Sequence, residues 1–508
     1  MLISNDKSTT PPIVASEALM RWWMRALIVV AIAFGLVNLT GAPHTWFDEG
    51  SHMMVPKTIV QDGVYADKSA DGYRYHGPTI GVGPTVMLPI ALSYQLFGIG
   101  LLQARMVIVL YLFTALALFF LLARRLHTPL IALVSVTILL ASGTMSYEGM
   151  PEYGRQVLGE VPGLAFLFLG IWAWVAALQN PKQQLRWSLL AGLGFGLAVI
   201  TKNQFTLIVM PTLALITLLD IFYYRAGSWA LRILPALIAT ICFGTWTVVQ
   251  FAFLGPGTFM ENMQQTRQAA GGAIFVFYMR STLRAGYYLL RPDLYGGLLI
   301  PALIYGLWRA RERSVRGLME ALPTLLVAIW LTWFVFVSLG WPRYAFPAVA
   351  IGAMLIGRAV VDFLAWLIQQ KRPGAAIAAA GYVTLAVALS LGLTVDRLSK
   401  VDHSAEQMIA FMRQHVPEDT LVATWEPEMG ALGNHRWDYP PQRLLDGVVR
   451  AQWLGGTMPT YDGLANQPPY VVVGNFGNLT KIYDKQKLGQ EYVLIYESGP
   501  YTLFKRSP

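Results

Sequence analysis

The chain has 508 residues, of which 55% are hydrophobic and only 13% are charged, and its formal net charge is +9. A mean hydropathy of +0.47 over this length excludes an ordinary soluble protein and indicates a polytopic membrane protein. The single cysteine, Cys242, lies in an apolar stretch and excludes an intramolecular disulfide.

The first apolar stretch runs from about residue 24 to about residue 40 and predicts a membrane-spanning helix that stays as an anchor. The polar segment that follows contains Asp48 and Glu49. Two adjacent carboxylates at a membrane face are costly to desolvate, so they must be hydrated, paired or used in chemistry. A carboxylate placed there can accept a proton from an attacking nucleophile. The alternative is a solvated loop that merely ends the first helix.

Residues 79–97 are apolar, but glycines and prolines interrupt them. If they crossed the membrane, the basic loops that follow would change sides. We therefore predict that this segment is a helix lying on the outer membrane surface. A true twelfth span is the alternative.

Further apolar stretches of about 20 residues recur up to about residue 395. Lys and Arg cluster in the short loops between them, and such loops are typically cytoplasmic. Eleven crossings place all the clusters on the cytoplasmic side, in a bacterial inner or plasma membrane, with the C-terminal segment outside. The basic residues that support this topology are Arg21, Arg25, Arg124, Arg125, Lys182, Arg186, Arg225, Arg232, Arg309, Arg311, Arg313, Arg316, Lys371 and Arg372.

The same topology gathers unusual polar residues on the outer side. They are Arg74 and His76 in the first outer loop (about 43–100), Arg105 in the second span, Glu148, Glu152, Arg155 and Glu160 around the next outer loop, Lys202 at an outer turn, and Arg343 with Tyr344 at the start of the tenth span. A cation at membrane depth is expensive unless it is paired, and a phosphate leaving group needs such cations. These residues therefore predict an outward-facing cavity for a phosphate-bearing headgroup.

Each residue also has a plainer interpretation. Arg105 and Arg343 are alternatively interfacial anchors, and Glu160 alternatively caps a helix or pairs with Arg155. The histidines show no metal-ligand spacing, so we expect no metal site and no cofactor, although the sequence does not exclude a divalent ion. No Gly-rich nucleotide-binding loop is present either.

Residues 396–508 are richer in charge and contain no stretch long enough to span a membrane. The pattern predicts a helix over 405–415, strands at 420–424 and 470–474, and a hairpin of 492–496 with 501–504. We therefore expect a membrane domain over 1–395 and a soluble extracytoplasmic α/β domain over 396–508. No catalytic group is evident in the second, which we expect to cover the cavity, present the acceptor, or only stabilise the protein.

The ordered set of motifs resembles the polytopic GT-C glycosyltransferases of the protein O-mannosyltransferase and aminoarabinose transferase (ArnT-like) kind, families 39 and 83. The matching pieces are Phe47-Asp48-Glu49-Gly50, Leu96-Phe97-Gly98, Arg105, Ala123-Arg124-Arg125-Leu126, Arg155 to Glu160, Leu197 to Lys202, and Pro342-Arg343-Tyr344 with Pro347. The resemblance covers about residues 24–365. Two positions depart from it: His76-Gly77-Pro78 stands where the family often has Lys-Pro-Pro, and Asn203 replaces the usual Gly.

The resemblance implies a membrane fold of about eleven spans and an inverting glycosyltransferase with a polyprenyl-phosphate-linked sugar as donor. Asp48 would be the base or acceptor-positioning carboxylate, and Glu49 would orient neighbouring cations. The donor phosphate would be held by Lys202, Arg343, Arg74 and His76, with Glu160, Arg155, Tyr344 and Arg105 in supporting positions. The acceptor would be a glycan, lipid or protein, and no nucleic acid would be involved.

Two other functions remain open from the sequence. One is a polysaccharide polymerase or ligase that uses a glycan-diphosphate lipid. The other is a non-enzymatic transporter or flippase for lipid-linked sugars, which would also have many spans and intramembrane charges. Against a transporter, the polar residues gather at the outer face and no inverted pair of broken segments is evident.

Overall fold

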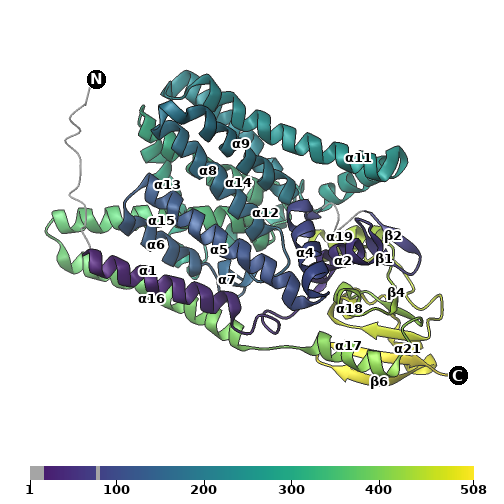
Figure 1. Ribbon diagram of the computed structural model, residues 1–508. Helices are drawn as coiled ribbons and strands as arrows, with labels where there is room; N and C mark the ends of the chain where they lie inside the picture. The colour runs from purple at the N-terminus through teal and green to yellow at the C-terminus, as the bar shows by residue number, and fades with distance from the viewer. Residues whose placement is uncertain (1–15, 76–80) are drawn as a thin grey trace.

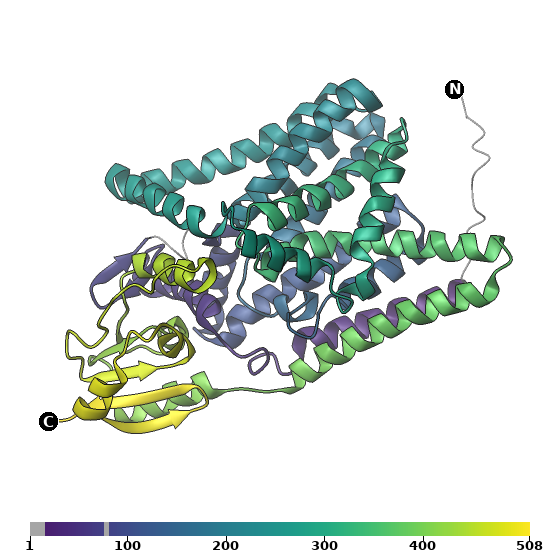
Figure 2. The same ribbon diagram turned by 180° about the vertical axis from the view of Figure 1, so that it is seen from behind.

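The computed structural model describes residues 16–75 and 81–508. A large body of packed helices is joined to a smaller body that contains the C-terminal sheet, and Figures 1 and 2 show this smaller body at one end of the helices. The chain passes from one body to the other directly after the last long apolar helix.

Among the described residues, nine helices are long and apolar enough to cross a membrane. They contain α1 (Glu17–Leu36), α5 (Leu101–Leu126), α8 (Glu160–Gln179), α9 (Gln184–Thr201), α10 (Asn203–Leu219), α11 (Trp229–Ala273), α14 (Val315–Phe336), α15 (Pro342–Gln369) and α16 (Pro373–Ser399). Three shorter apolar helices are α4 (Pro84–Phe97), α6 (Pro129–Leu140) and α13 (Leu299–Ala310). The prediction of a multi-pass helical membrane protein is confirmed.

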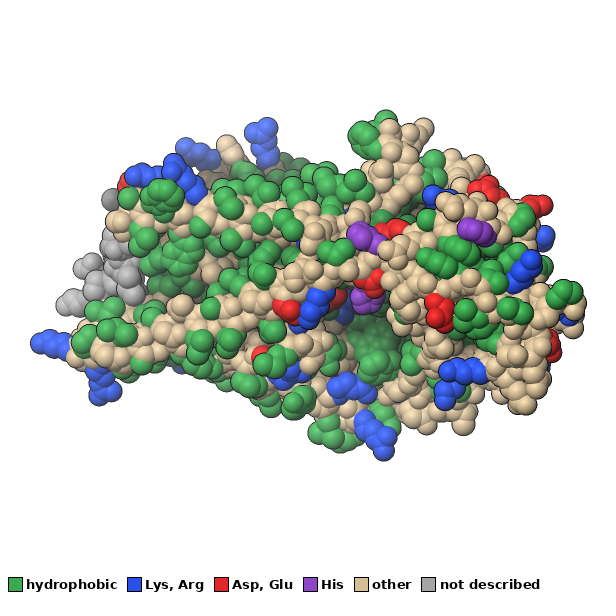
Figure 3. All heavy atoms as spheres, turned by 90° about the horizontal axis from the view of Figure 1, so that it is seen from below, with side chains coloured by type: hydrophobic (Ala, Val, Ile, Leu, Met, Phe, Trp, Pro, Cys, Tyr) green, Lys and Arg blue, Asp and Glu red, His purple; other side chains and the backbone are tan. Residues whose placement is uncertain are grey.

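Burial separates central helices from peripheral ones. In α8, 83% of the apolar window is buried, whereas the windows of α1 and α16 are 17% and 11% buried. α1 and α16 lie side by side along one edge in both ribbon views. Figure 3 shows the face that contains them as mainly apolar, with basic side chains at one end and charges of both signs over the C-terminal body. An apolar flank of this kind suits contact with lipid.

Within the part of the chain that the structure describes, two helices, α2 and α4, lie between the first two spans. α1 ends at Leu36, and α2 (Phe47–Asp62) begins only after a turn, so Asp48 and Glu49 stand in the first turn of a separate helix rather than at the end of the first span. The predicted surface helix over 79–97 corresponds to α4, which starts with Pro84 and has 14 residues. That length is well below the roughly 20 residues needed to cross a bilayer.

The C-terminal body contains a five-stranded sheet in the order β4-β3-β5-β7-β6. Its strands are β3 (Leu421–Thr424), β4 (Arg436–Asp438), β5 (Tyr470–Val473), β6 (Tyr492–Ser498) and β7 (Tyr501–Arg506), with β3 parallel to β4 and β5, and β7 antiparallel to β5 and β6. Its helices are α17 (Ser404–His415), α18 (Pro427–Leu432), α19 (Arg443–Leu454), α20 (Asn475–Thr480) and α21 (Lys485–Glu491). The predicted helix, strands and hairpin are all present, whereas β4 and α18 to α21 were not predicted.

The C-terminal body holds α2 in place. A Cβ atom on Gly50 would lie 2.2 Å from the backbone nitrogen of Glu428, so only glycine lets α18 approach α2 this closely. The Nζ of Lys57 donates to the carbonyl oxygens of Gly430 at 2.7 Å and Gly433 at 2.5 Å. The position of α2, and with it the position of its first turn, therefore depends on the C-terminal body.

Candidate active site

Four charged side chains from four helix ends meet in a chain of alternating sign. Asp48 comes from the first turn of α2, Glu160 begins α8, Lys202 joins α9 to α10, and Arg343 lies in the first turn of α15. Nη2 of Arg343 lies 2.6 Å from Oδ2 of Asp48, and its Nε lies 3.3 Å from Oε1 of Glu160. Lys202 donates to the same Glu160 oxygen. We call these four residues the ionic cluster.

A backbone break places Lys202. Its φ of −155° and ψ of 134° interrupt the helical path between α9 and α10, and it forms an isolated antiparallel bridge with Val82. The backbone nitrogen of Gly83 donates to the carbonyl of Thr201 at 2.8 Å. A Cβ atom on Gly83 would lie 1.7 Å from the carbonyl oxygen of Ile200, so glycine is required where α4 meets this break.

The ionic cluster is shielded but not sealed. The side chain of Glu160 is fully buried, that of Arg343 is 15% exposed, and that of Asp48 is 29% exposed. Burial by itself would raise the pKa of Asp48, but the charge of Arg343, with His52 and Lys202 behind it, holds that pKa below its usual range. The lowered pKa favours the ionised form of Asp48, and its side chain remains partly open to solvent.

Two polar atoms in the ionic cluster lack a hydrogen-bond partner among the described residues: Nη1 of Arg343 and Oε2 of Glu160, both buried. A buried guanidinium nitrogen without an acceptor is costly. An added phosphate oxygen would satisfy it with a charge-assisted hydrogen bond. The hydrogen-bond donors of the ionic cluster therefore fit a phosphate group.

Glu148 extends the site. The sequence placed it among the outer polar residues but assigned it no role. The ring of Trp46 lies 5.3 Å from the guanidinium of Arg343, and its Nε1 donates to Oε1 of Gln156 at 2.6 Å. Gln156 also hydrogen-bonds Glu148, whose pKa burial raises to about 7. A carboxyl group that titrates near neutral pH suits proton transfer. The only sequence signal for it is an acid in a short loop between two apolar stretches.

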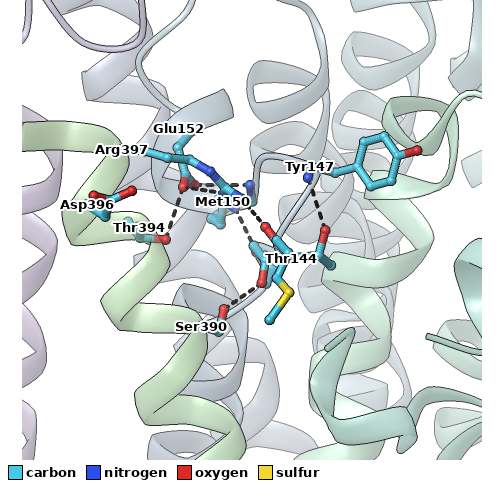
Figure 4. Close-up of polar contacts among 12 residues, drawn as sticks. Thr144, Tyr147, Met150, Glu152, Ser390, Thr394, Asp396 and Arg397 are labelled. Atoms are coloured by element: carbon cyan, nitrogen blue, oxygen red, sulfur yellow. Dashed lines mark hydrogen bonds and ion pairs between the residues drawn. The ribbon is translucent and has the colours of Figure 1, made fainter. Parts of the chain in front are cut away.

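The loop that carries Glu148 is fixed by the last long helix. Figure 4 shows Glu152 turned toward α16, where its Oε1 accepts from Arg397 Nη1 and from Thr394 Oγ1, each at 3.0 Å. Ser390 of the same helix donates to the carbonyl of Gly143 at 2.7 Å. These contacts tie the loop that carries Glu148 to α16.

Glu49 does not face the ionic cluster. Its carboxylate accepts two hydrogen bonds from Arg105, at 2.8 and 2.6 Å, and both side chains are fully buried. Arg105 also donates to the carbonyls of Leu39 and Pro43, and Glu49 accepts from the backbone nitrogen of Val157 at 3.1 Å. Glu49 was predicted to orient neighbouring cations, and the cation that it holds is Arg105, outside the ionic cluster, because adjacent residues of α2 point to different sides. The alternative interpretation of Arg105 as an interfacial anchor is wrong, because its side chain is fully buried.

Two further predicted site residues lie elsewhere. Arg155 donates to the carbonyls of Phe34 and Val37 at the end of α1, so it does not pair with Glu160. Arg74 pairs with Asp67 at 2.9 Å and lies over the ring of Tyr439, in the C-terminal body. The structure thus assigns both arginines to packing contacts instead of to the ionic cluster.

Tyr344 and His76 complete the predicted set. Tyr344 follows Arg343 and is buried, with its ring stacked on Trp333 and its carbonyl accepting from Trp330 at 2.7 Å. It therefore anchors the first turn of α15. His76 lies outside the described residues. Within 16–75 and 81–508, no group of three or more His, Cys, Asp and Glu side chains is arranged to hold a metal ion.

Comparisons with known proteins bear on the family and the fold. Residues 81–249 match the model of the dolichyl-phosphate-mannose-protein mannosyltransferase family. The fold is similar to ArnT from Cupriavidus metallidurans bound to undecaprenyl phosphate, with a TM-score of 0.62, 14% identity, and 95% of this chain and 98% of that chain covered. The fold is likewise similar to ArnT from Cupriavidus metallidurans in the apo state. The TM-score is 0.63 and the identity 16%, with 96% of this chain and 98% of that chain covered.

The fold is also similar to the archaeal oligosaccharyltransferase AglB from Archaeoglobus fulgidus in complex with an inhibitory peptide and a dolichol-phosphate. In that case the TM-score is 0.56 and the identity 12%, with 97% of this chain and 75% of that chain covered. No curated protein sequence matches the chain. The family match and the shared fold together confirm the resemblance of this chain to the GT-C membrane glycosyltransferases.

Proposed function

We propose that this protein is an integral-membrane glycosyltransferase that moves a sugar from a polyprenyl-phosphate donor to an acceptor on the extracytoplasmic side. The observation that carries the proposal is the ionic cluster, which joins an accessible carboxylate, Asp48, to two cations at the helix ends. The undecaprenyl phosphate bound in the similar ArnT structure supports a lipid phosphate as the carrier.

In the proposed reaction, an acceptor oxygen attacks the anomeric carbon of the donor as the bond from that carbon to the phosphate oxygen breaks, with inversion. Arg343 and Lys202 stabilise the charge that develops on the departing phosphate. Glu160 holds both cations in the absence of donor, and the phosphate takes over part of its contacts. Because the phosphate leaves already ionised, no acid is required on its side.

Asp48 serves the acceptor in this proposal. Its ionised, partly exposed carboxylate accepts the hydrogen bond of the acceptor hydroxyl and takes its proton as the new bond forms. Glu148, whose pKa is about 7, is suited to receive that proton afterwards. If the acceptor is an ionised phosphate, no proton moves and Asp48 only positions it.

The proposed topology has eleven crossings: the nine long helices together with α6 and α13, but not α4. Every helix end that contributes to the ionic cluster then lies at the extracytoplasmic face, and the C-terminal body lies on the same side. Reporter fusions after Gly374 and after Pro508 should report opposite sides of a bacterial inner membrane. Fusions that report the same side would refute the outward-facing site.

Transfer itself is tested with purified protein and a short-chain polyprenyl-phosphate donor carrying a radiolabelled sugar. We expect labelled acceptor and released polyprenyl phosphate in equal amounts. A transporter would move the intact donor across the membrane of a vesicle without releasing the phosphate. A polymerase of the kind considered above would need a glycan-diphosphate donor instead. Asp48→Asn is the matched control, because it keeps the shape of the side chain and removes its charge.

A further inference from the structure

A groove in the C-terminal body has no role in the proposed chemistry. It has a volume of about 660 Å³, within the range of roughly 300–1,000 Å³ typical of ligand sites. One wall is the end of α19 with the segment after it, including Gln452 and Tyr461, and the other is α20, including Asn478. Figures 1 and 2 show α19 at the junction of the C-terminal body with the helical body.

The lining of the groove indicates what it can bind. Gln452 and Asn478 are exposed, and neither side-chain amide hydrogen-bonds another described residue. Thr460 adds a hydroxyl, Tyr461 an aromatic ring, and of the described lining residues Lys481 alone is charged. A prenyl chain would require a continuous apolar lining, and a phosphate would require several cations. Met458, Pro459 and Leu479 add apolar patches between these polar groups. A mixed lining of amides, hydroxyls and an aromatic ring suits a neutral saccharide, whose hydroxyls hydrogen-bond and whose C–H face packs on the ring.

Both walls of the groove contact aromatic residues that stand close in the chain to members of the ionic cluster. Trp453, the neighbour of Gln452, packs edge-to-face on Trp341 with ring centroids 5.3 Å apart, and Trp341 lies two residues before Arg343. Arg284 lies over Trp453 and fixes it from the other side. The groove and Arg343 are thus connected through one edge-to-face pair of tryptophan rings.

The second wall makes the corresponding contact with Asp48. Phe476 of α20 packs on Phe47, the residue before Asp48, with ring centroids 4.1 Å apart. Asn478 lies two residues further along, on the other side of the same helix. About one helix thickness, roughly 10 Å, therefore separates the groove from the charged residues.

We propose that this groove binds the acceptor, and that the acceptor is an oligosaccharide whose terminal hydroxyl reaches Asp48 while its inner sugars lie between α19 and α20. This inference rests on the proposed transferase function and adds to it the chemical class of the acceptor. It also gives the C-terminal body a substrate-binding role beyond holding α2.

A blocking experiment tests the proposal. Asn478→Cys is labelled with a bulky, membrane-impermeant maleimide in membranes that contain the native acceptor, and transfer from radiolabelled donor is measured. We expect at least a tenfold loss of transfer, with binding of polyprenyl phosphate unchanged. Gln486→Cys, on α21 of the same body, is labelled as the matched control and should keep full transfer. The natural Cys242 lies in α11, and labelled wild-type protein controls for it.

A second variant tests the groove without attaching a bulky label. Tyr461→Ala should raise the acceptor KM by roughly two- to tenfold, as expected for the loss of one aromatic contact, and should leave the donor KM unchanged. Full transfer by the labelled Asn478→Cys protein would overturn the proposal, and so would a product whose radioactivity is released by protease, because the acceptor would then be a polypeptide. No transfer by unlabelled wild-type protein would instead refute the proposed function itself.

Discussion

The buried pair of Glu49 and Arg105 provides the sharpest test of which acid of the Asp48-Glu49 doublet has a structural role. Both side chains are fully buried and joined by two short hydrogen bonds. Glu49→Gln keeps the shape, and the amide oxygen still accepts from Val157, but the charge of Arg105 is left without a counter-ion. Breaking a buried pair in this way costs about 3–5 kcal/mol, a large part of the 5–15 kcal/mol that stabilises a typical domain.

Thermal unfolding in detergent, followed by tryptophan fluorescence, measures the effect. Glu49→Gln should lower the melting temperature markedly, and Arg105→Met should do the same. The double variant should cost less than the sum of the two single changes, since it leaves no unpaired charge. A normal melting temperature together with a large loss of turnover in Glu49→Gln would refute the reasoning and return Glu49 to a direct role in the chemistry.

Four further outcomes are expected. Asp48→Asn should lower turnover by about two to four orders of magnitude while changing donor binding and melting temperature far less; normal turnover would return it to a solvated-loop residue. Lys202→Met or Arg343→Met should weaken polyprenyl-phosphate binding, measured by titration, by roughly one to two orders of magnitude. This corresponds to about 1.5–3 kcal/mol for the loss of one charge-assisted hydrogen bond. Unchanged binding in both variants would make these residues interface anchors. Gly50→Val should displace α2 from α18 and reduce turnover as well as stability, because its Cβ meets backbone, and an unaffected enzyme would show that α18 can move aside. Burial, and then the neighbouring charge of Glu426, raise the pKa of Glu428, so the folded protein keeps a proton that the unfolded chain releases near pH 4.5, and stability should fall as pH rises beyond that value. Glu428→Gln should therefore flatten the decline of melting temperature between about pH 5 and pH 8. If the variant declined in the same way as the wild type, the decline would belong to other groups.

The sequence predicted correctly those features that depend on interactions between residues close together in the chain. Apolar stretches of sufficient length predict spanning helices, because each such helix satisfies its own backbone hydrogen bonds without reference to the rest of the chain. The glycines and prolines of residues 79–97 similarly predicted a segment different from its neighbours, and α4 is too short to cross. The strand at 420–424 and the hairpin of 492–496 with 501–504 followed from β-branched runs and a turn.

The sequence also identified most of the charged residues near the site but not their partners. It predicted that cations at membrane depth need counter-charges, and the structure pairs Arg343 with Asp48 and Glu160, Lys202 with Glu160, and Arg105 with Glu49. Arg155 satisfies the same need with helix-end carbonyls, which no charge pattern reveals.

What the sequence alone determined is therefore the class of the protein, the order of its membrane helices and the set of residues that need partners. The tertiary structure decided which of these residues meet, because the ionic cluster joins the first turns of α2 and α15, which lie nearly 300 positions apart in the chain. It also decided the unequal roles of Asp48 and Glu49. Because adjacent residues of a helix point in different directions, Asp48 faces the accessible site while Glu49 forms a buried ion pair with Arg105. The packing of α2 against α18 and α5 fixes the orientation of α2 about its own axis.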